Sequence, residues 1–271
     1  MYLICAFHFW VIEFGFRPVK LGTNYFILMD LLSGKNYIPQ VAIDFVIFGY
    51  EDHQLKILVS KLAFKGDFYA LHSGFIGQEE DLDDAAERIL EDRTGIKDIY
   101  FEQFKVFGKV DHQRKQFLDK LIASNYPGDE ELLKKPDQAY AWFTKRFISI
   151  GYYSLVDIKK VKPKLSQLDA SIEWYSIDEV PKMIMHYDEM FKEALQTLKE
   201  DIDQKFNAFN LLPEKFTMKE VQQIYETIFK RKFTRSNFQK KILDMNVLQR
   251  LEKKYTGAKN KAPYLYCIKT K

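Results

Sequence analysis

The sequence contains little cysteine and no long apolar run. Its two cysteines, Cys5 and Cys267, lie near opposite ends of the chain without metal-ligand spacing, so neither a disulfide framework nor a zinc site is indicated. No stretch approaches the roughly 18 uninterrupted apolar residues of a membrane span. Residues 2–16 are rich in aromatic side chains but lack the positive leader and cleavage site of a secretory signal. These absences favour a protein of the reducing cytoplasm, without membrane contact, bound metal or cofactor.

The first 36 residues form an extension to which no function is assigned. Met29 lies shortly before the first recognisable segment. A mis-assigned start codon is therefore an alternative interpretation of this stretch.

Charge is distributed unevenly along the chain. Residues 230–271 contain thirteen Lys and Arg but two acidic residues, a net +11 in a protein whose formal total is +3, so the first 229 residues sum to −8. Such a basic segment indicates a polyanionic partner, with a solvated basic tail as the simpler alternative. Because 46% of the residues are hydrophobic and 15% aromatic, the chain is expected to form two globular domains with separate cores.

The basic segment and the residues just before it have the periodicity of two short helices. Thr217 and Glu220 stand at the spacing of a capping box, which starts a helix. Apolar residues follow at helical spacing until the basic run 230–232 interrupts them. Thr234 or Ser236 offers the next N-cap before a second apolar face. Helix, tight turn and helix are therefore predicted in place of a disordered tail.

Two strand-like segments follow, residues 247–251 and 264–268, on either side of a loop that contains two lysines. A basic hairpin after a helix-turn-helix makes a winged helix, whose second helix, here residues 234–246, enters the major groove of DNA. We expect arginine to pair with guanine, Asn or Gln with adenine, and lysine with phosphates. The candidate DNA-binding residues are Arg231, Lys232, Thr234, Arg235, Ser236, Asn237, Gln239, Lys240, Lys241, Lys259 and Lys261.

The preceding part of the chain alternates like a small α/β domain. Strands are predicted over residues 41–48, 55–59, 101–108, 147–156 and 172–177, and helices over residues 82–93, 116–123 and 188–199. The first two strands form a hairpin joined by a polar turn at residues 50–54.

Residues 74–96 resemble the Nudix box, whose pattern is G-x5-E-x7-R-E-U-x-E-E-x-G-U with U an apolar residue. The matched positions are Gly74, Glu80, Arg88, Leu90, Gly95 and Ile96. In that family the box presents three carboxylates on one helix face, at i, i+3 and i+4, to hold Mg2+ against a pyrophosphate.

The metal-binding positions of the box are altered in this chain. They carry Ile89, Asp92 and Arg93, so one acid of three remains, and an Arg guanidinium competes with a cation for the same space. We therefore expect no hydrolysis by the usual route of the family. Glu80 and Arg88 are expected to pair with each other and fasten the loop to the helix.

Residues 112–145 form a polar insertion that departs from the compact family pattern and ends in Tyr140, Trp142 and Phe143. We expect these aromatic residues to pack a subdomain; stacking on a sugar or nucleotide is the alternative. The candidate effector-binding residues lie in the box and are Phe75, Glu80, Arg88 and Asp92.

A degenerate Nudix domain followed by a Leu-Leu-Pro-x-x-Phe-Thr linker (residues 211–217) and a winged helix is similar to the Nudix-related transcriptional regulators of bacteria. The resemblance covers residues 37–269. It implies a mixed-sheet α/β/α sandwich (α+β class) over residues 37–203 and a winged helix-turn-helix domain over residues 204–271. It also implies a homodimer that binds a double-stranded DNA operator and senses a small effector, either ADP-ribose and related NAD metabolites or a sugar such as arabinose.

Two other classes of function remain open from the sequence. The first is an active Mg-dependent Nudix hydrolase of a nucleoside diphosphate derivative, with an accessory nucleic-acid-binding domain. The second is an RNA-associated enzyme, against which the absence of an RNP-like aromatic strand counts.

Overall fold

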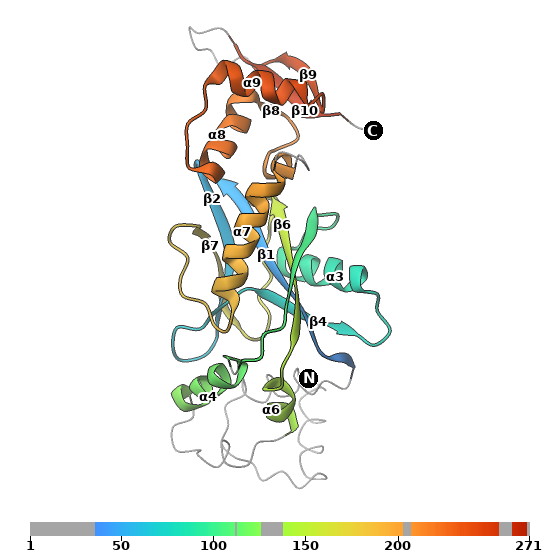
Figure 1. Cartoon of the computed structure of the whole chain (residues 1–271), viewed down its shortest axis with the longest axis vertical. Helices are drawn as coiled ribbons and strands as arrows, with labels where there is room; N and C mark the ends of the chain where they lie inside the picture. Colours follow the sequence, from blue (N-terminus) through green and yellow to red (C-terminus); the bar gives the residue numbers. More distant parts are fainter. Residues whose placement is uncertain (1–35, 112, 126–137, 203–206, 255–261, 270–271) are drawn as a thin grey trace, which may run out of the picture.

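The computed structural model describes residues 36–111, 113–125, 138–202, 207–254 and 262–269. Figure 1 shows an elongated molecule with three levels along its long axis. A small helical domain with its own sheet lies at one end, a large sheet flanked by helices lies in the middle, and two short helices lie at the other end.

The middle of the molecule is a seven-stranded mixed sheet. Its path is β3 (Tyr69–Ala70), β2 (Gln54–Leu62), β1 (Tyr37–Glu51), β6 (Ile148–Val156) and β5 (Phe101–Phe107), while β4 (His72–Gly77) pairs with β1 and β7 (Asp169–Ser176) pairs with β2. β1 and β6 run parallel and the other pairs are antiparallel. The mixed sheet predicted from the sequence is confirmed.

The first hairpin is tighter than the predicted turn over residues 50–54. Only Asp52 and His53 separate β1 from β2, both at positive φ (49° and 62°), as in the type I′ turns that suit two-residue hairpins. The strands therefore extend beyond the predicted ranges.

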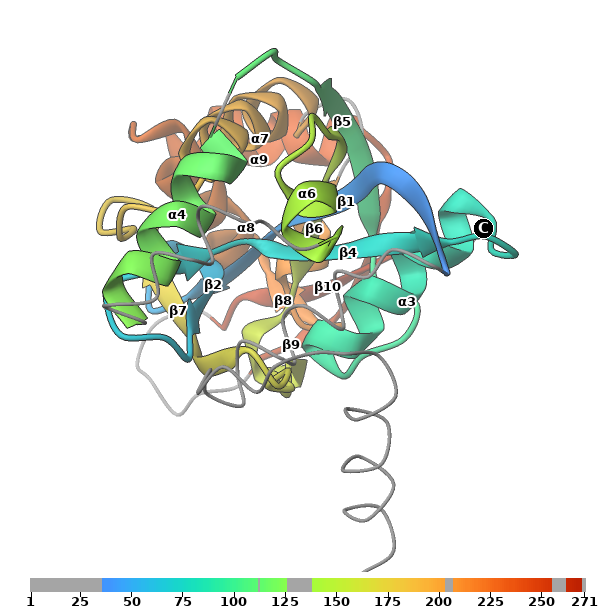
Figure 2. The ribbon, with the colours of Figure 1, turned by 90° about the horizontal axis from the view of Figure 1, so that it is seen from below.

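Two helices cover the sheet on opposite faces, as Figure 2 shows: α3 (Leu82–Thr94) and α7 (Tyr187–Asp201). Because side chains alternate along a strand, β1 serves both layers. Ile43 and Phe45 belong to the core cluster with α3, whereas Val46 and Phe48 belong to the cluster with α7. The result is the predicted α/β/α sandwich. A short 3-10 turn, η1 (Ile158–Lys160), follows β6.

The described part of the insertion contains α4 (Gln113–Asn125) and α6 (Gln138–Phe143). Leu118 and Leu121 of α4 form a separate buried cluster with Tyr140 and Phe143 of α6 and with Phe68 from the loop after β2. Packing of a subdomain, the favoured prediction for these aromatic residues, is thereby confirmed. The helix predicted over residues 116–123 is longer because Arg114, one turn before Phe117, is also buried.

The carboxy-terminal domain is a winged helix. It comprises η2 (Asn207–Leu211), β8 (Phe216–Thr217), α8 (Met218–Phe229), α9 (Arg235–Asp244), β9 (Leu248–Lys253) and β10 (Tyr264–Ile268), with the strand order β8-β10-β9. β9 and β10 are the stems of the wing. The predicted tip residues Lys259 and Lys261 lie outside the described residues.

One continuous apolar cluster joins the winged helix to the sandwich. It runs from the sheet through Leu198 and Ile202 at the end of α7 to Tyr225 of α8 and Phe238 of α9. The Tyr225 hydroxyl donates to the carbonyl oxygen of Ile202 at 3.3 Å. α7 is therefore the element that connects the two domains. Residues 203–206, where the domain boundary was predicted, are not among those described.

Candidate functional sites

The first helix of the winged helix starts as the sequence predicts. The Thr217 hydroxyl accepts from the Glu220 backbone N–H at 3.3 Å, and the Glu220 carboxylate accepts from the Thr217 N–H at 2.6 Å. This reciprocal capping box satisfies two of the backbone donors that a helix N-terminus leaves unpaired. α8 then buries Val221, Ile224 and Ile228 against the domain core.

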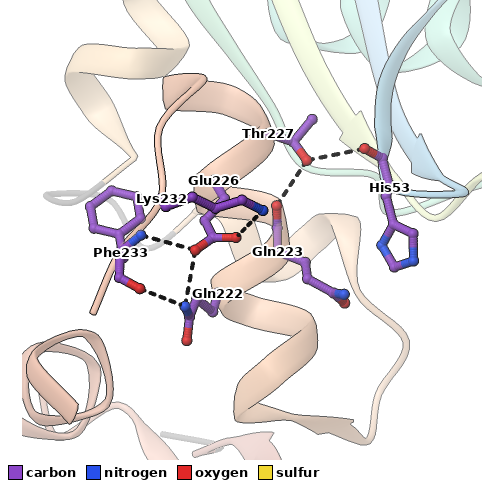
Figure 3. Close-up of polar contacts among 7 residues, drawn as sticks. All are labelled: His53, Gln222, Gln223, Glu226, Thr227, Lys232 and Phe233. Carbon is purple, nitrogen blue, oxygen red and sulfur yellow. Dashed lines mark hydrogen bonds and ion pairs between the residues drawn. The ribbon is translucent and has the colours of Figure 1, made fainter. Parts of the chain in front are cut away.

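Glu226 on α8 fixes the turn between the two helices, as Figure 3 shows. Its carboxylate accepts from the Phe233 N–H at 2.9 Å, from Gln222 Nε2 at 3.0 Å and from Lys232 Nζ at 3.1 Å. The hydrogen bond from Phe233 is the main reason why the pKa of Glu226 is lowered. Lys230 ends α8 in the left-handed conformation (φ 52°). Glu226 was not singled out in the sequence, where it reads as one more polar residue on a helix.

α9 has one buried side and one exposed side. Phe238 and Ile242 are buried, whereas Arg235, Ser236, Asn237, Lys240 and Lys241 are exposed and Gln239 is half-buried. The helix is shorter than the predicted 234–246 because the chain turns away at Asn246, which takes positive φ (55°). Thr234 precedes the helix and makes no side-chain cap. The predicted recognition residues thus share one outward surface.

The cations of this surface differ in their surroundings. Lys232 is bound to Glu226, and the Arg231 guanidinium lies over the rings of Phe229 (5.6 Å) and Phe233 (4.9 Å). Lys241 Nζ lies 5.7 Å from the centre of the Tyr225 ring. Within the described segments, Arg235 and Lys240 have neither an ion pair nor a ring contact. A shallow groove beside them is lined by Asn237, Lys240, Lys241, Asp244 and Met245.

The loop of the Nudix-like box is fastened as predicted by Glu80 and Arg88. Arg88 Nε and Nη2 donate to the two oxygens of Glu80 at 2.6 and 2.8 Å, and the Gly77 N–H donates to the same carboxylate at 3.0 Å. These hydrogen bonds, chiefly those from Arg88, lower the pKa of Glu80 to about 2. Arg88 also donates to the Phe75 carbonyl at 3.0 Å.

The three metal-binding positions of the box do not form a carboxylate cluster. Ile89 is 3% exposed and packs so closely on Gly74 that a Cβ there would lie 2.6 Å from Ile89 Cγ1. Asp92 is exposed on the outer side of α3, 3.9 Å from Arg88. No group of three or more His, Cys, Asp or Glu side chains suited to a metal ion occurs in the described part of the chain.

Arg93, the third of these positions, is held by Asp169 at the start of β7. Arg93 Nη1 donates to Asp169 Oδ2 at 2.7 Å, and the Asp169 side chain is 3% exposed. The same oxygen accepts from the Ser166 N–H at 2.7 Å. His72 is buried nearby, and burial, followed by the charge of Arg93, lowers its pKa to about 3. Asp169 stands 76 residues from Arg93, so no local sequence pattern indicated the pair.

The predicted effector residues are spread along the box, with Phe75 on β4, Glu80 in the loop, Arg88 in the middle of α3 and Asp92 near its end, and they are already engaged. Glu80 and Arg88 bind each other. The Phe75 ring packs on Trp142, with ring centroids 5.2 Å apart. Asp92 is the most exposed of the four, with a side chain 66% exposed.

None of the helices in the described segments is long and apolar enough to cross a membrane.

Comparisons with known proteins agree with both halves of this description. Residues 208–268 match the family of NrtR DNA-binding winged helix domains. The ADPR responsive transcriptional repressor NtrR of Acinetobacter baylyi is 22% identical over 230 residues, which are 83% of this chain and 80% of that protein.

Two solved structures share the fold over most of the chain. NrtR of Shewanella oneidensis has a TM-score of 0.62 at 20% identity and covers 85% of this chain and 94% of its own; it has also been solved with a 27mer DNA. A MutT/nudix family protein of Enterococcus faecalis has a TM-score of 0.60 at 17% identity and covers 86% of this chain and 89% of its own. The chain thus joins a winged helix domain that matches the NrtR DNA-binding family, over residues 208–268, to an α/β/α sandwich with the fold of these Nudix-containing structures.

Proposed function

We propose that this protein binds an operator through its winged helix and senses ADP-ribose or a closely related metabolite through its Nudix domain, without hydrolysing it. The exposed polar and basic side of α9, in a domain that matches a DNA-binding family, is the observation that carries the proposal. Operator binding implies action in the cytoplasm. The two domains are assigned to residues 37–203 and 204–271.

The N-terminal half of α9 is assigned to base recognition. We assign Arg235 to bidentate donation to guanine, and Asn237 or Gln239 to pairing with adenine. Lys240, Lys241, Lys232 and Arg231 contribute positive charge for phosphates, as do Lys259 and Lys261 in the wing, while Thr234 and Ser236 offer hydroxyl contacts at the helix start. A homodimer would present two such helices to the half-sites of a palindrome.

The absence of hydrolysis is proposed from the side chains at the metal positions. A magnesium ion bound by the box needs several oxygen ligands, but Ile89 is apolar and Arg93 occupies its position as a cation bound to Asp169. Only Asp92 retains a carboxylate at these positions. Asp92 is thus the one feature at these positions that favours the active hydrolase, the alternative from the sequence.

The effector is proposed to be ADP-ribose because the curated relative from Acinetobacter baylyi is named as ADPR responsive. This favours the NAD-metabolite branch of the family over the sugar branch. A regulator with two conformations of different DNA affinity is controlled by its effector when the effector binds one conformation more tightly than the other.

A direct contact between the domains supports such coupling (Figure 3). The Thr227 hydroxyl of α8 lies 3.2 Å from the carbonyl oxygen of His53, in the turn between β1 and β2, and 2.8 Å from the Gln223 carbonyl of its own helix, so its one proton is shared between two acceptors. Lys230, at the end of the same helix, pairs with Asp178 of the Nudix domain. A change in the sandwich therefore has a short path to the helix that positions α9.

The proposal is tested by fluorescence anisotropy with labelled duplexes from the region upstream of the protein's own gene. We expect sequence-specific binding that weakens steeply with salt, because phosphate contacts release counterions, and a change in affinity when ADP-ribose is added. Equal affinity for every duplex at all salt concentrations would refute operator binding. In parallel, Mg2+-dependent release of AMP from ADP-ribose that disappears in Asp92→Ala would refute the inert box.

A further inference from the structure

A pocket lies on the α7 face of the sheet, away from the Nudix-like box. Its lining comes from the end of β5, the start of α4, the segment before β6 and the start of α7. The cavity is small, about 30 Å3, so it has room for one group of a ligand and not for a whole small molecule, whose sites span roughly 300–1,000 Å3. The residues used below are Lys109, Arg114, Arg146, Phe147, His186 and Glu189, all of which line it.

Arg114 is the unusual residue of this pocket. It is 8% exposed, and its guanidinium lies 3.9 Å from the centre of the Phe147 ring and 5.1 Å from that of Phe143. It makes no hydrogen bond or ion pair with any other described residue. Arginine has five N–H donors and remains charged. A buried guanidinium with rings stacked on it but no acceptor is poised for an external acceptor.

A further polar group beside Arg114 lacks a partner. The Nε2 atom of His186 is buried without a hydrogen bond inside the described structure, whereas the buried carboxylate of Asp44 interacts with the Tyr187 hydroxyl and with the charge of Arg114 and does not line the pocket. Asp44 lies on the α7 face of β1, in register with Ser73 of β4. Burial without a hydrogen bond is unfavourable for a polar group, and more so for a charged one. Buried polar groups without a hydrogen bond are rare in native folds, and one explanation for such a group is that it binds a ligand.

The rim of the pocket is, by contrast, held by contacts within the protein. Lys109 Nζ donates to both oxygens of Glu189 at 2.7 and 2.9 Å, and Arg146 Nε donates to the Gly108 carbonyl at 3.0 Å. These bonds tie the chain before and after the insertion to each other and to α7. The guanidinium of Arg114 is thus a preorganised donor set inside a rim that is already formed.

We propose that this pocket, and not the box, receives the oxyanion group of the effector. The Arg114 guanidinium binds a phosphate or carboxylate in its fork, and His186, which also lines the pocket, contacts a neighbouring polar atom of the ligand. The proposal rests on the function proposed above and names the site of its effector. A diphosphate such as that of ADP-ribose has the required chemistry, whereas an uncharged sugar does not.

The location explains how the ligand reaches the winged helix. His186 and Tyr187 stand at the start of α7, and Leu198 and Ile202 at its far end belong to the core that contains Tyr225. A helix is a rigid element, with a rise of about 1.5 Å per residue. A ligand that binds Arg114 and His186 therefore contacts the start of α7, and the end of α7 packs against α8.

The site is tested by calorimetric titration of ADP-ribose into the full chain and into Arg114→Met, which keeps the stacked volume and removes the donors. We expect at least a tenfold loss of affinity. Arg250→Met is the matched control, because the Arg250 guanidinium also lies over an aromatic ring, that of Tyr264 at 4.6 Å, but in the winged helix; its affinity is expected to stay within threefold of the unaltered chain. Arg88→Gln is made as well, because Arg88 is a candidate effector residue of the box. Full affinity in Arg114→Met, or loss confined to Arg88→Gln, would overturn the proposal.

Cooperative thermal unfolding establishes that each variant is folded, and Arg114→Gln, which also removes the charge, replaces Arg114→Met if the latter is not. The unaltered chain is also heated with inorganic pyrophosphate and with D-ribose. A rise in Tm with pyrophosphate alone supports the oxyanion site, since a ligand of the native state stabilises it. If neither ADP-ribose nor pyrophosphate binds, the pocket proposal fails; specific operator binding in the same preparation would then leave the regulatory function standing.

Discussion

The arginines of two helices, α3 in the Nudix-like box and α9 in the winged helix, have opposite surroundings. Arg88 and Arg93 of α3 are each bound by a carboxylate of the same chain. Arg235 of α9 is exposed and has no carboxylate partner in the described segments. The number of charged residues on a helix therefore does not show whether the helix is structural or binds a partner. The residues that pair with those charges do show it.

The difference follows from what each helix is packed against. α3 lies on the sheet, so Arg93 at its end meets β7 and the buried Asp169. α9 packs on α8 through Phe238 and Ile242 and turns its other side outward. A helix that uses its cations internally stabilises a fold, whereas one that leaves them unpaired retains them for an anionic partner.

The largest effect is expected from Arg93→Met, which removes the partner of a buried carboxylate. Breaking a buried ion pair from one side destabilises a protein by roughly 3–5 kcal/mol, and we expect about 3 kcal/mol because the Arg93 side chain is 21% exposed. Urea unfolding followed by circular dichroism measures the change. In Arg93→Met/Asp169→Asn most of the loss is expected to be recovered. A single variant as stable as the unaltered chain would mean that the pair contributes nothing to the fold.

Arg235→Gln tests the other side of the comparison, where no internal partner is lost. Stability is expected to stay within about 0.5 kcal/mol, as for most surface substitutions, while operator affinity falls by about 1–3 kcal/mol, or some 5- to 150-fold. Binding to a scrambled duplex is expected to fall less. Anisotropy with both duplexes gives the two values. An equal loss on both would assign Arg235 to phosphate and not to a base.

The sequence predicted local features well and long-range pairs poorly. Thr217 with Glu220 and Glu80 with Arg88 were predicted because each pair lies within one turn, or within one loop and its helix, where spacing fixes geometry. Asp169 and Arg114 were not found. Their importance depends on tertiary contacts, with Arg93 in one case and with Phe147 in the other, and neither residue stands in a motif.

The buried His72, near Arg93 and Asp169, makes the stability of the folded chain depend on pH. An unfolded histidine titrates near pH 6.5, whereas burial lowers the pKa of His72 in the folded chain to about 3. The unfolded state therefore binds the proton more readily. Stability from this group is complete above pH 6.5 and falls by about 1.4 kcal/mol per unit below it, until pH 3.

Urea unfolding at pH 7 and pH 5 is expected to show this loss, about 2 kcal/mol, in the unaltered chain and to lack it in His72→Gln. His53→Asn, at an exposed histidine in the first hairpin turn, is the control and is expected to retain the pH dependence. If His72→Gln loses as much stability as the unaltered chain between the two values, other groups cause the slope.

Lys240→Gln is expected to give the smallest effect and to reveal how α9 meets DNA. An exposed lysine that neutralises one phosphate adds about 0.9 to the slope of log affinity against log salt concentration, without reading bases. The variant should therefore lose a few-fold in affinity at moderate salt, equally on operator and scrambled duplexes, and its slope should be shallower by about 1. Lys182→Gln is the control, because that lysine is 91% exposed but belongs to the Nudix domain, and its slope should not change. If Lys240→Gln keeps the full slope while Arg235→Gln loses specificity, α9 must enter the groove with only its first turn. Its groove beside Asn237 and Asp244 would then face solvent and not the DNA backbone.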